Sequence, residues 1–125
     1  NKPVYKLSGG QRQRAFLSLA LAQDTQTLLL DEPTTFLDLR YQLQFLDLLK
    51  KINHEKKISI ITVIHDLNLA ARYCDRIAVL KEGKLLAIDS PRKALNNHLI
   101  TNAFQVETCQ IETPIGLQIC TIKYD

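Results

Sequence analysis

The chain has 125 residues, of which 46% are hydrophobic, so it is long enough for one domain with a modest core and too apolar for a disordered polypeptide. Its net charge of +3 is too small to indicate binding to nucleic acid or to an anionic membrane surface. No apolar run approaches the roughly 18 residues of a membrane-spanning helix, and we expect no secretory signal, because the first residues have no apolar segment.

The first informative pattern is Leu7–Gln11, Leu-Ser-Gly-Gly-Gln, directly before a helix expected from about Gly10 to Ala22. Ser8 is a good N-cap residue, and Gly9 and Gly10 allow backbone N–H groups to approach a phosphate closely. The helix adds the positive end of its dipole. Taken alone, this pattern is more often a plain helix start than an anion-binding site.

An apolar run then ends in two adjacent acidic residues and a proline. Residues 26–31 predict a buried parallel strand, which Glu32 and Pro33 follow. Because ligands of open α/β sheets bind beyond the carboxyl ends of the strands, Asp31 and Glu32 are expected where chemistry occurs. An Asp there can hold Mg²⁺, and a Glu one residue on can orient or deprotonate an attacking water. Taken alone, the two acids would more often mark an acidic turn.

A second strand is expected parallel to the first. A polar connector, Thr34–Asp38, leads to a helix from Leu39 to about Asn53, on which leucines repeat at helical spacing. Residues 58–64 are rich in β-branched side chains and predict a buried strand that points His65 at the same sheet edge as Asp31. The strand–helix–strand order therefore predicts a right-handed βαβ unit.

Beyond His65 the expected elements are shorter. Ser90 and Pro91 are typical of a helix start, and Glu82-Gly83 is typical of a hairpin turn. The expected order is a helix over residues 66–73, strands over 76–81 and 84–89, a short helix to about 95 and a further helical segment to about 104.

Residues 105–124 predict a C-terminal β-hairpin with a type I turn and a left-handed Gly bulge. The register that groups apolar side chains on one face pairs Thr113 with Leu117, Ile111 with Ile119 and Cys109 with Thr121. A shift of one residue would instead place Cys109 opposite Cys120, so we predict free thiols. The hairpin is interpreted as an edge element that completes the fold or contributes to a dimer contact.

The three cysteines indicate a reducing environment. They form no Cys-x-x-Cys pair, and an odd number without a disulfide framework suits the cytosol. The histidines do not cluster with the cysteines in sequence, so we expect no zinc site.

Together, these motifs resemble the ATP-binding subunit of ABC transporters. The Leu-Ser-Gly-Gly-Gln pattern, a basic helix, Leu-Leu-Leu-Asp-Glu-Pro, Thr-Thr-Phe-Leu-Asp and a His after an apolar run stand in that family's order over residues 4–95. Residues 31–38 and 65–75 look most like the subunits that drive import of ferric siderophores, haem or cobalamin. The resemblance implies an α/β fold, the C-terminal part of a P-loop NTPase (ABC ATPase) fold, with parallel strands, flanking helices and C-terminal antiparallel hairpins. It assigns residues 1–95 to the C-terminal half of the ATP-binding domain and 96–125 to an extension of helix and hairpin.

The resemblance also indicates a missing half. None of the four glycines opens a Gly-x-x-x-x-Gly-Lys-[Ser/Thr] loop, and the family's Gln-containing loop, which lies upstream of the signature, is absent as well. The chain has no Met and begins with Asn1. We therefore expect a piece of a longer polypeptide, which would be inactive as an ATPase without the rest.

In the family, two subunits enclose two ATP molecules, and each site combines the P-loop of one chain with the signature of the other. The resemblance implies that Ser8, Gly9 and Gly10 contact the γ-phosphate bound to the partner subunit, and that Gln11 shapes this contact. Asp38 would bridge the two subunits and couple their sites.

The remaining implied roles concern hydrolysis, which needs ATP and Mg²⁺ as cofactors. Asp31 would hold the Mg²⁺, and Glu32 would polarise the attacking water. His65 would donate a hydrogen bond to the γ-phosphate and hold Glu32 and the water in place. Thr35 stands where the wider family commonly has Ser, which keeps the hydroxyl group.

The implied function is the ATP-hydrolysing subunit of an importer for iron chelates or a related metal-cofactor compound. Its expected partners are a second ATP-binding subunit, membrane permease subunits and, indirectly, a substrate-binding protein, at the cytoplasmic side of the membrane and without nucleic acid. One alternative is a DNA-repair or chromosome ATPase, although the sustained heptads of such proteins do not occur here. Another is a truncated, non-catalytic dimerisation partner.

Overall fold

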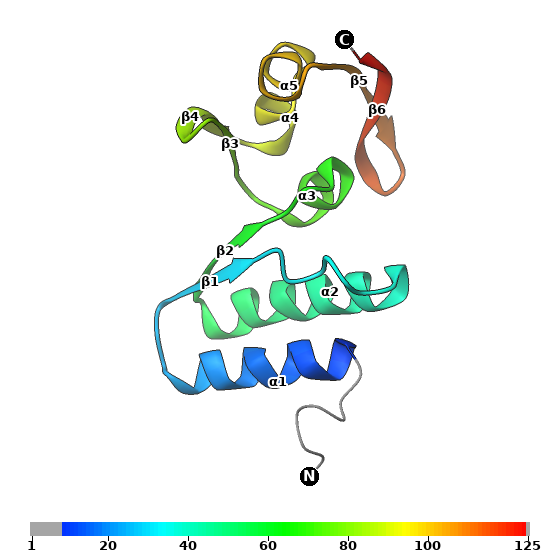
Figure 1. Ribbon diagram of the computed structural model, residues 1–125. Helices are drawn as coiled ribbons and strands as arrows, with labels where there is room; N and C mark the ends of the chain where they lie inside the picture. The colour runs from blue at the N-terminus through cyan, green and yellow to red at the C-terminus, as the bar shows by residue number, and fades with distance from the viewer. Residues whose placement is uncertain (1–8, 125) are drawn as a thin grey trace. The chain divides into compact units, whose positions relative to one another are not determined.

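The computed structural model describes residues 9–124, which form five helices and six strands (Figure 1). The chain divides between Ile64 and His65 into two compact units. Each unit contains a hydrophobic cluster of its own and is described separately below.

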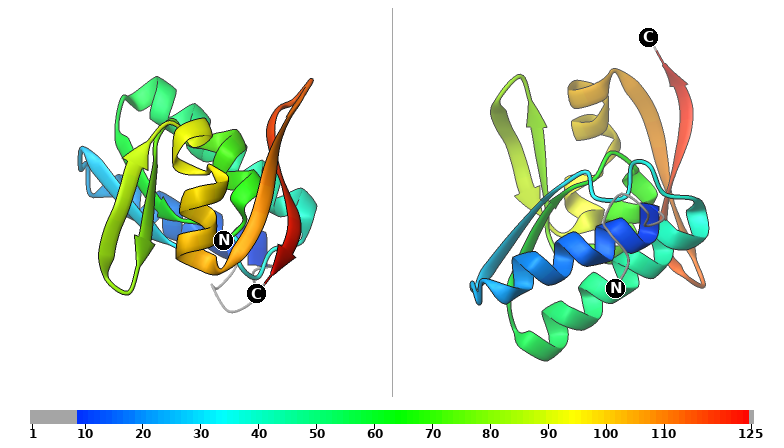
Figure 2. Two further views of the ribbon diagram at one scale, coloured as in Figure 1. Left: turned by 90° about the horizontal axis from the view of Figure 1, so that it is seen from above. Right: turned by 60° about the horizontal axis from the view of Figure 1, so that its bottom comes forward.

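The first unit contains the predicted βαβ arrangement. Strands β1 (Thr27–Asp31) and β2 (Ser59–Val63) are parallel, and α2 (Leu39–Lys56) connects them. Helix α1 (Gly9–Ala22) precedes them and packs beside α2 (Figures 1 and 2). The expected ranges are therefore confirmed to within a few residues, which is the usual uncertainty of helix and strand ends.

Helix α2 ends at Lys56, about one turn beyond the predicted end near Asn53, because contacts at its C-terminus stabilise the last turn. Lys57 ends it in the left-handed conformation, with φ 54° and ψ 35°. The side chain of Asn53 donates a hydrogen bond of 2.7 Å to the carbonyl oxygen of Ile58, beyond the helix end. This contact turns the chain from α2 into β2.

The strands of this unit are buried on one face only, which corrects the expectation of fully buried strands. Leu28 is buried, and α2 contributes a row of buried apolar residues that packs toward the strands: Phe45, Leu46, Leu49 and Ile52. On the opposite face of the strand pair, Leu29 is 72% and Ile61 58% exposed. Apolar sequence runs do not reveal how many sides of a strand are covered, because that depends on the elements packed against it.

The second unit begins with α3 (Leu67–Tyr73) and the hairpin of β3 (Ile77–Lys81) and β4 (Lys84–Asp89). Two short helices follow, α4 (Pro91–Ala94) and α5 (Asn97–Phe104). The hairpin turn at Glu82 and Gly83 has positive φ at both residues, 48° and 73°, as expected for a two-residue turn that matches the strand twist.

The long C-terminal hairpin of β5 (Val106–Thr113) and β6 (Gly116–Tyr124) shares its core with the rest of the second unit. This core is formed by Leu95, Ile100 and Ile119, and partly buried apolar residues from α3, β3 and β6 pack against it. Residues 96–124 therefore pack against residues 65–95 within one unit. The family-based boundary after residue 95 remains a prediction.

The register predicted for the C-terminal hairpin is wrong by one residue. The observed pairs include Thr113 with Gly116, Ile111 with Gln118 and Cys109 with Cys120. Gly116 has the expected positive φ, 112°, but it pairs with Thr113 instead of forming a bulge at the turn. All three cysteines are unbonded, so the prediction of free thiols is confirmed although the register behind it is not.

Contacts outside the hairpin account for this register. Ile119 on β6 is buried in the core, whereas Ile111 on β5 is 47% exposed. The residue opposite Ile119 is Gln110, whose Nε2 donates hydrogen bonds to the carbonyl oxygens of Arg92 at 2.8 Å and Leu95 at 3.1 Å. The sequence pattern favours an apolar cross-strand pair. The observed register gives up that pair and instead satisfies backbone carbonyl groups of α4 and its C-cap with hydrogen bonds.

The observed register predicts that Cys109 and Cys120 can be cross-linked. Directly opposite residues have Cβ atoms about 4.5–5.5 Å apart, which a small movement brings into disulfide range. We expect glutathione disulfide to oxidise this pair, with a mass loss of about 2 Da after loss of two hydrogens. Cleavage after Glu107 and Glu112 separates the two cysteines, so mass spectrometry should find the two peptides joined until a reductant is added.

The variant Cys74→Ser serves as the control, because it removes the remaining cysteine and should give the same cross-link. Recovery of the Cys109 and Cys120 peptides unlinked, at the oxidant concentration that modifies both thiols, would contradict the register.

Candidate functional site

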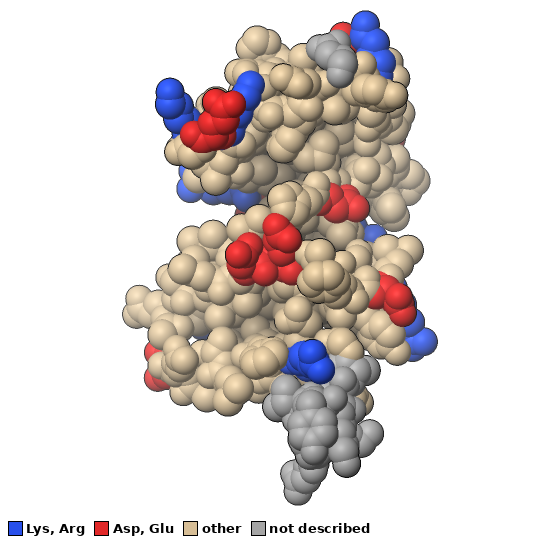
Figure 3. Space-filling model, in the orientation of Figure 1, with Lys and Arg blue, Asp and Glu red and all other residues tan. Residues whose placement is uncertain are grey.

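The acidic residues lie at the carboxyl end of β1. Asp31 is the last residue of the strand, is exposed, and pairs with Val63 at the end of β2. The parallel register therefore brings the ends of both strands to one edge. Acidic side chains gather at the surface in the region of this strand end (Figure 3).

Glu32 has an unusual backbone conformation directly after the strand. Its φ of 47° lies in the left-handed region, which costs a non-glycine residue about 1–3 kcal/mol and is concentrated at functional sites. The Thr35 hydroxyl lies 3.2 Å from the Glu32 carbonyl oxygen and 3.4 Å from Oε2, within hydrogen-bond reach of both. The strained turn and Thr35 together orient the Glu32 carboxylate. The sequence pattern alone did not reveal this orientation.

The connector between β1 and α2 is held by a residue that sequence analysis did not single out. The side-chain amide of Gln42, on α2, donates hydrogen bonds to the carbonyl oxygens of Thr34 at 3.2 Å and Leu37 at 2.9 Å. Thr34 and Leu37 are both buried. The contact could have been suspected from the sequence, because a polar residue stands one turn into a helix that follows a polar connector.

Asp38 occupies the N-cap position of α2, but its side chain makes no capping hydrogen bond. Its carboxylate is exposed at the end of the connector. The backbone still begins the helix, since the N–H of Gln42 donates to the Asp38 carbonyl oxygen at 2.9 Å. The side chain is therefore not used to stabilise its own helix, unlike a typical N-cap aspartate.

The two glycines at the start of α1 lie against the end of the connector and the first turn of α2. A Cβ atom on Gly9 would stand 3.3 Å from Leu37 Cδ2, and one on Gly10 would stand 3.4 Å from Tyr41 Cδ1. The contact would be tight at Gly9 and an ordinary van der Waals contact at Gly10, so close approach restricts the side chain mainly at Gly9. Gln11 lies in the first turn of α1 and is exposed, whereas Ser8 lies outside the described residues.

His65 begins the second unit, two residues after β2, and its side chain is exposed. The next residue, Asp66, is the N-cap of α3 and accepts hydrogen bonds from the N–H groups of Asn68 at 2.9 Å and Leu69 at 3.0 Å. This cap could have been inferred from the sequence, because Asp directly before an apolar helical pattern is a typical start signal.

The structure thus brings most of the predicted site residues of the first unit together. Gly9 and Gly10 contact the connector or the start of α2, and this connector begins at Asp31 and Glu32 and ends at Asp38. His65 belongs to the second unit. Across residues 9–124, no three His, Cys, Asp or Glu side chains are grouped as a complete protein-only metal site.

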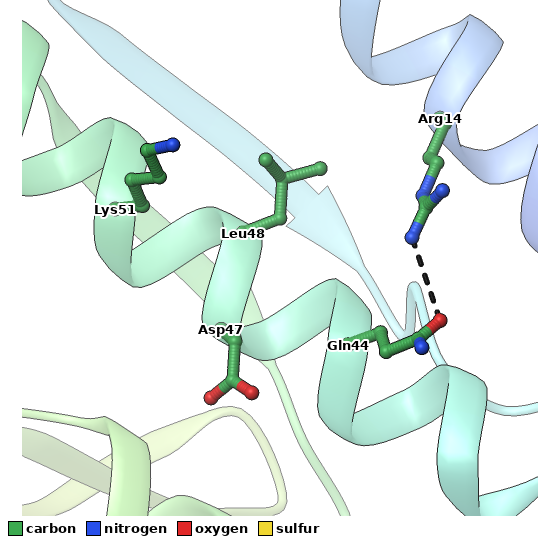
Figure 4. A pocket seen from close by; sticks show the side chains of 5 residues that line it. All are labelled: Arg14, Gln44, Asp47, Leu48 and Lys51. Carbon is green, nitrogen blue, oxygen red and sulfur yellow. Dashed lines mark hydrogen bonds between the residues drawn. The ribbon is translucent and has the colours of Figure 1, made fainter.

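An open cavity of about 560 Å³ lies between α1 and α2, and none of its lining residues is a predicted site residue (Figure 4). Arg14 Nη2 and Gln44 Oε1 approach to 3.5 Å across it, and Asp47, Leu48 and Lys51 complete its lining. Because its charged residues are exposed and of both signs, the cavity does not indicate a particular ligand.

Comparison with known proteins identifies related sequences. A family model described as ABC transporter matches residues 1–35. The chain is 44% identical over 121 residues to the "Petrobactin import ATP-binding protein FpuD" of Bacillus anthracis, covering 95% of this chain and 44% of that protein. It is 42% identical over 116 residues to the "Ferric enterobactin transport ATP-binding protein FepC" of Escherichia coli, covering 93% of this chain and 43% of that protein. The chain thus spans less than half the length of these relatives.

Solved structures show the same fold. A putative metal-chelate type ABC transporter in an inward-facing conformation matches 98% of this chain and 49% of its own, with a TM-score of 0.84 and 24% identity. The ATP-binding cassette MJ0796, in a dimeric post-hydrolysis state bound to ADP and Pi, matches 74% of this chain and 39% of its own, with a TM-score of 0.62 and 39% identity. None of the helices in residues 9–124 is long and apolar enough to cross a membrane.

The contacts of Gln42 lead to a prediction about the connector. Replacing Gln42 with Ala removes two donors from partly buried carbonyl groups, so we expect the free energy of unfolding to fall by about 1–2 kcal/mol. Gln44→Ala is the matched control on the same helix, with an expected change within about 0.5 kcal/mol, because within residues 9–124 Gln44 makes only the long contact to Arg14. Urea denaturation of the full-length protein measures both, and equal losses for the two variants would contradict the role of Gln42.

Proposed function

We propose that this chain, which is similar to ABC transporter ATP-binding proteins, is part of a longer protein that hydrolyses ATP to drive import of an iron chelate. The observation that carries this proposal is the segment Asp31–Asp38. It begins at the carboxyl end of a parallel strand, holds Glu32 in a strained conformation beside Thr35, and lies against Gly9 at the start of α1.

Phosphate binding is assigned to the start of α1. Ser8, Gly9 and Gly10 would contact the γ-phosphate of ATP bound to a second subunit, and Gln11 would shape this contact. The first N–H groups of an α-helix have no acceptors within the helix, which supports an anion there. Asp38 would reach across the dimer, and its lack of a capping bond to α2 supports that role.

Asp31 is the residue that would hold Mg²⁺. Carboxylate oxygens suit this cation, which is typically bound by one or two carboxylates together with substrate phosphates, and Asp31 is exposed at the strand end. Bound Mg²⁺ and ATP would supply an electrophilic γ-phosphoryl group with part of its negative charge neutralised.

Glu32 and His65 are assigned to the hydrolysis step. The Glu32 carboxylate would accept a proton from the attacking water, and its fixed backbone conformation favours one orientation of the side chain. The His65 side chain would donate a hydrogen bond to the γ-phosphate and position Glu32 and the water. The absence of a P-loop from this chain means that the activity needs the rest of the protein.

The proposed partners follow from the relatives. A second ATP-binding subunit would complete each site, as in the dimeric cassette, and membrane permease subunits would couple hydrolysis to import. The protein would lie at the cytoplasmic side of the membrane, and a substrate-binding protein would act indirectly. An iron-chelate cargo is supported by the named import of petrobactin and transport of ferric enterobactin in two relatives, which also favours an importer over a DNA-repair ATPase.

The variant Glu32→Gln tests the assignment of the general base in the full-length protein. We expect kcat for ATP hydrolysis to fall by about 10²–10⁴-fold, because an amide cannot accept the proton, while ATP binding and ATP-driven dimerisation persist. Glu55→Gln on α2 is the control for loss of a carboxylate and should leave kcat unchanged. Turnover of Glu32→Gln within a few-fold of wild type would exclude the general-base role.

Uptake of radioactive iron tests the proposed cargo. Cells that lack the gene should lose uptake of at least one ferric siderophore, and the wild-type gene should restore it, whereas the gene for Glu32→Gln should not. If deletion leaves uptake of catecholate siderophores, hydroxamate siderophores and haem unchanged, the iron-chelate assignment is wrong.

A further inference from the structure

The side chain of Asn68 makes a two-point contact with the backbone of a residue 51 positions away. Its Oδ1 accepts a hydrogen bond of 2.7 Å from the N–H of Ile119, and its Nδ2 donates one of 3.2 Å to the Ile119 carbonyl oxygen. Both backbone groups of Ile119 are thereby satisfied by one amide side chain. The Asn68 amide thus pairs with the backbone of β6 as the peptide group of a neighbouring strand would, and it links β6 to α3.

This contact lies close to His65 along the chain. Asn68 is three residues after His65, in the first turn of α3, and its own N–H donates to the capping carboxylate of Asp66 at 2.9 Å. Leu67 and Ala71, on the same helix, pack against the core that contains Ile119. The segment that carries His65 is therefore attached to the C-terminal hairpin by polar and apolar contacts.

Helix α3 depends on such contacts because it has only seven residues. A helix of this length is not stable by itself in water, so its place is determined by what it packs against. The C-terminal hairpin is itself held in place, because Ile119 is only 6% exposed and Gln110 binds β5 to the end of α4. It can therefore fix the position of α3.

We propose that Asn68 is a positioning residue for His65: it ties the turn after β2 to the C-terminal hairpin, so that the hairpin determines where the His65 side chain is held. The inference rests on the proposed function, because it matters for catalysis only if His65 contacts the γ-phosphate. It gives residues 105–124 a part in hydrolysis, through the position of His65.

The test compares two amide side chains that hold the same hairpin. Asn68→Ala removes the link to α3, whereas Gln110→Ala removes two hydrogen bonds from the same hairpin to α4, which does not carry His65. In the full-length protein we expect Asn68→Ala to lower kcat roughly 5- to 50-fold with little change in KM for ATP, because displacement of a catalytic group can cost up to about 10²-fold. The kcat of Gln110→Ala should stay within about twofold of wild type, even if this variant loses as much thermal stability as Asn68→Ala.

A double-mutant cycle with His65→Ala separates positioning from general stability. If Asn68 acts through His65, adding Asn68→Ala to His65→Ala should change the residual single-turnover rate by less than about twofold. Hydrogen exchange supplies a readout without activity: the amides of residues 66–73 should exchange faster in Asn68→Ala than in Gln110→Ala. Asn68→Asp keeps the acceptor for the Ile119 N–H and should give an intermediate kcat, which keeps the test valid if Asn68→Ala does not fold.

Three results would overturn the inference. One is an equal loss of kcat in Asn68→Ala and Gln110→Ala, and another is the same fold-loss from Asn68→Ala with and without His65. The third is a kcat of Asn68→Ala and Asn68→Asp within twofold of wild type while His65→Ala is strongly impaired, which would leave the proposed function standing. Normal turnover of His65→Ala would instead contradict the role of His65 in the proposed function and the inference with it.

Discussion

The parallel pairing of β1 with β2 is the constraint on which the candidate site depends. Because the two strands run in the same direction, both end at one edge, and the residues that follow each strand start from that edge. The acids Asp31 and Glu32 and the connector to α2 follow the first strand, and His65 follows the second by two residues. At the start of α1, Gly9 lies against Leu37 of the connector and Gly10 against Tyr41 of α2.

Side-chain amides hold the irregular segments of both units. Gln42 binds two carbonyl groups of the connector in the first unit, and Asn68 and Gln110 bind the ends or edges of backbone elements in the second. Such bonds suit segments that have no regular partner, because each satisfies buried or half-buried backbone groups that would otherwise lose their water. They also leave carboxylates such as that of Asp38 uncommitted to structure.

Much of the local structure follows from the sequence. The helix and strand ranges, the hairpin at Glu82-Gly83 and the end of β1 at Asp31 were all predicted, because propensity, apolar periodicity and turn residues act within a few positions of one another. The order of the motifs likewise indicates the family, and the similarity to related proteins supports it. The individual roles of Ser8, Gln11 and the other site residues remain predictions.

The sequence by itself therefore determined which elements form and which residues stand at their ends. Only the tertiary structure decided the left-handed turn at Glu32, the exposure of one face of β1 and β2, and the register of β5 with β6. In the hairpin, local pairing favoured Ile111 opposite Ile119, but the core took Ile119 alone, and Gln110 was placed where it could bind the end of α4. The exposure of the strands and the register of the hairpin depend on groups far apart in the chain, and sequence patterns over a few residues carry no information about which distant groups will meet.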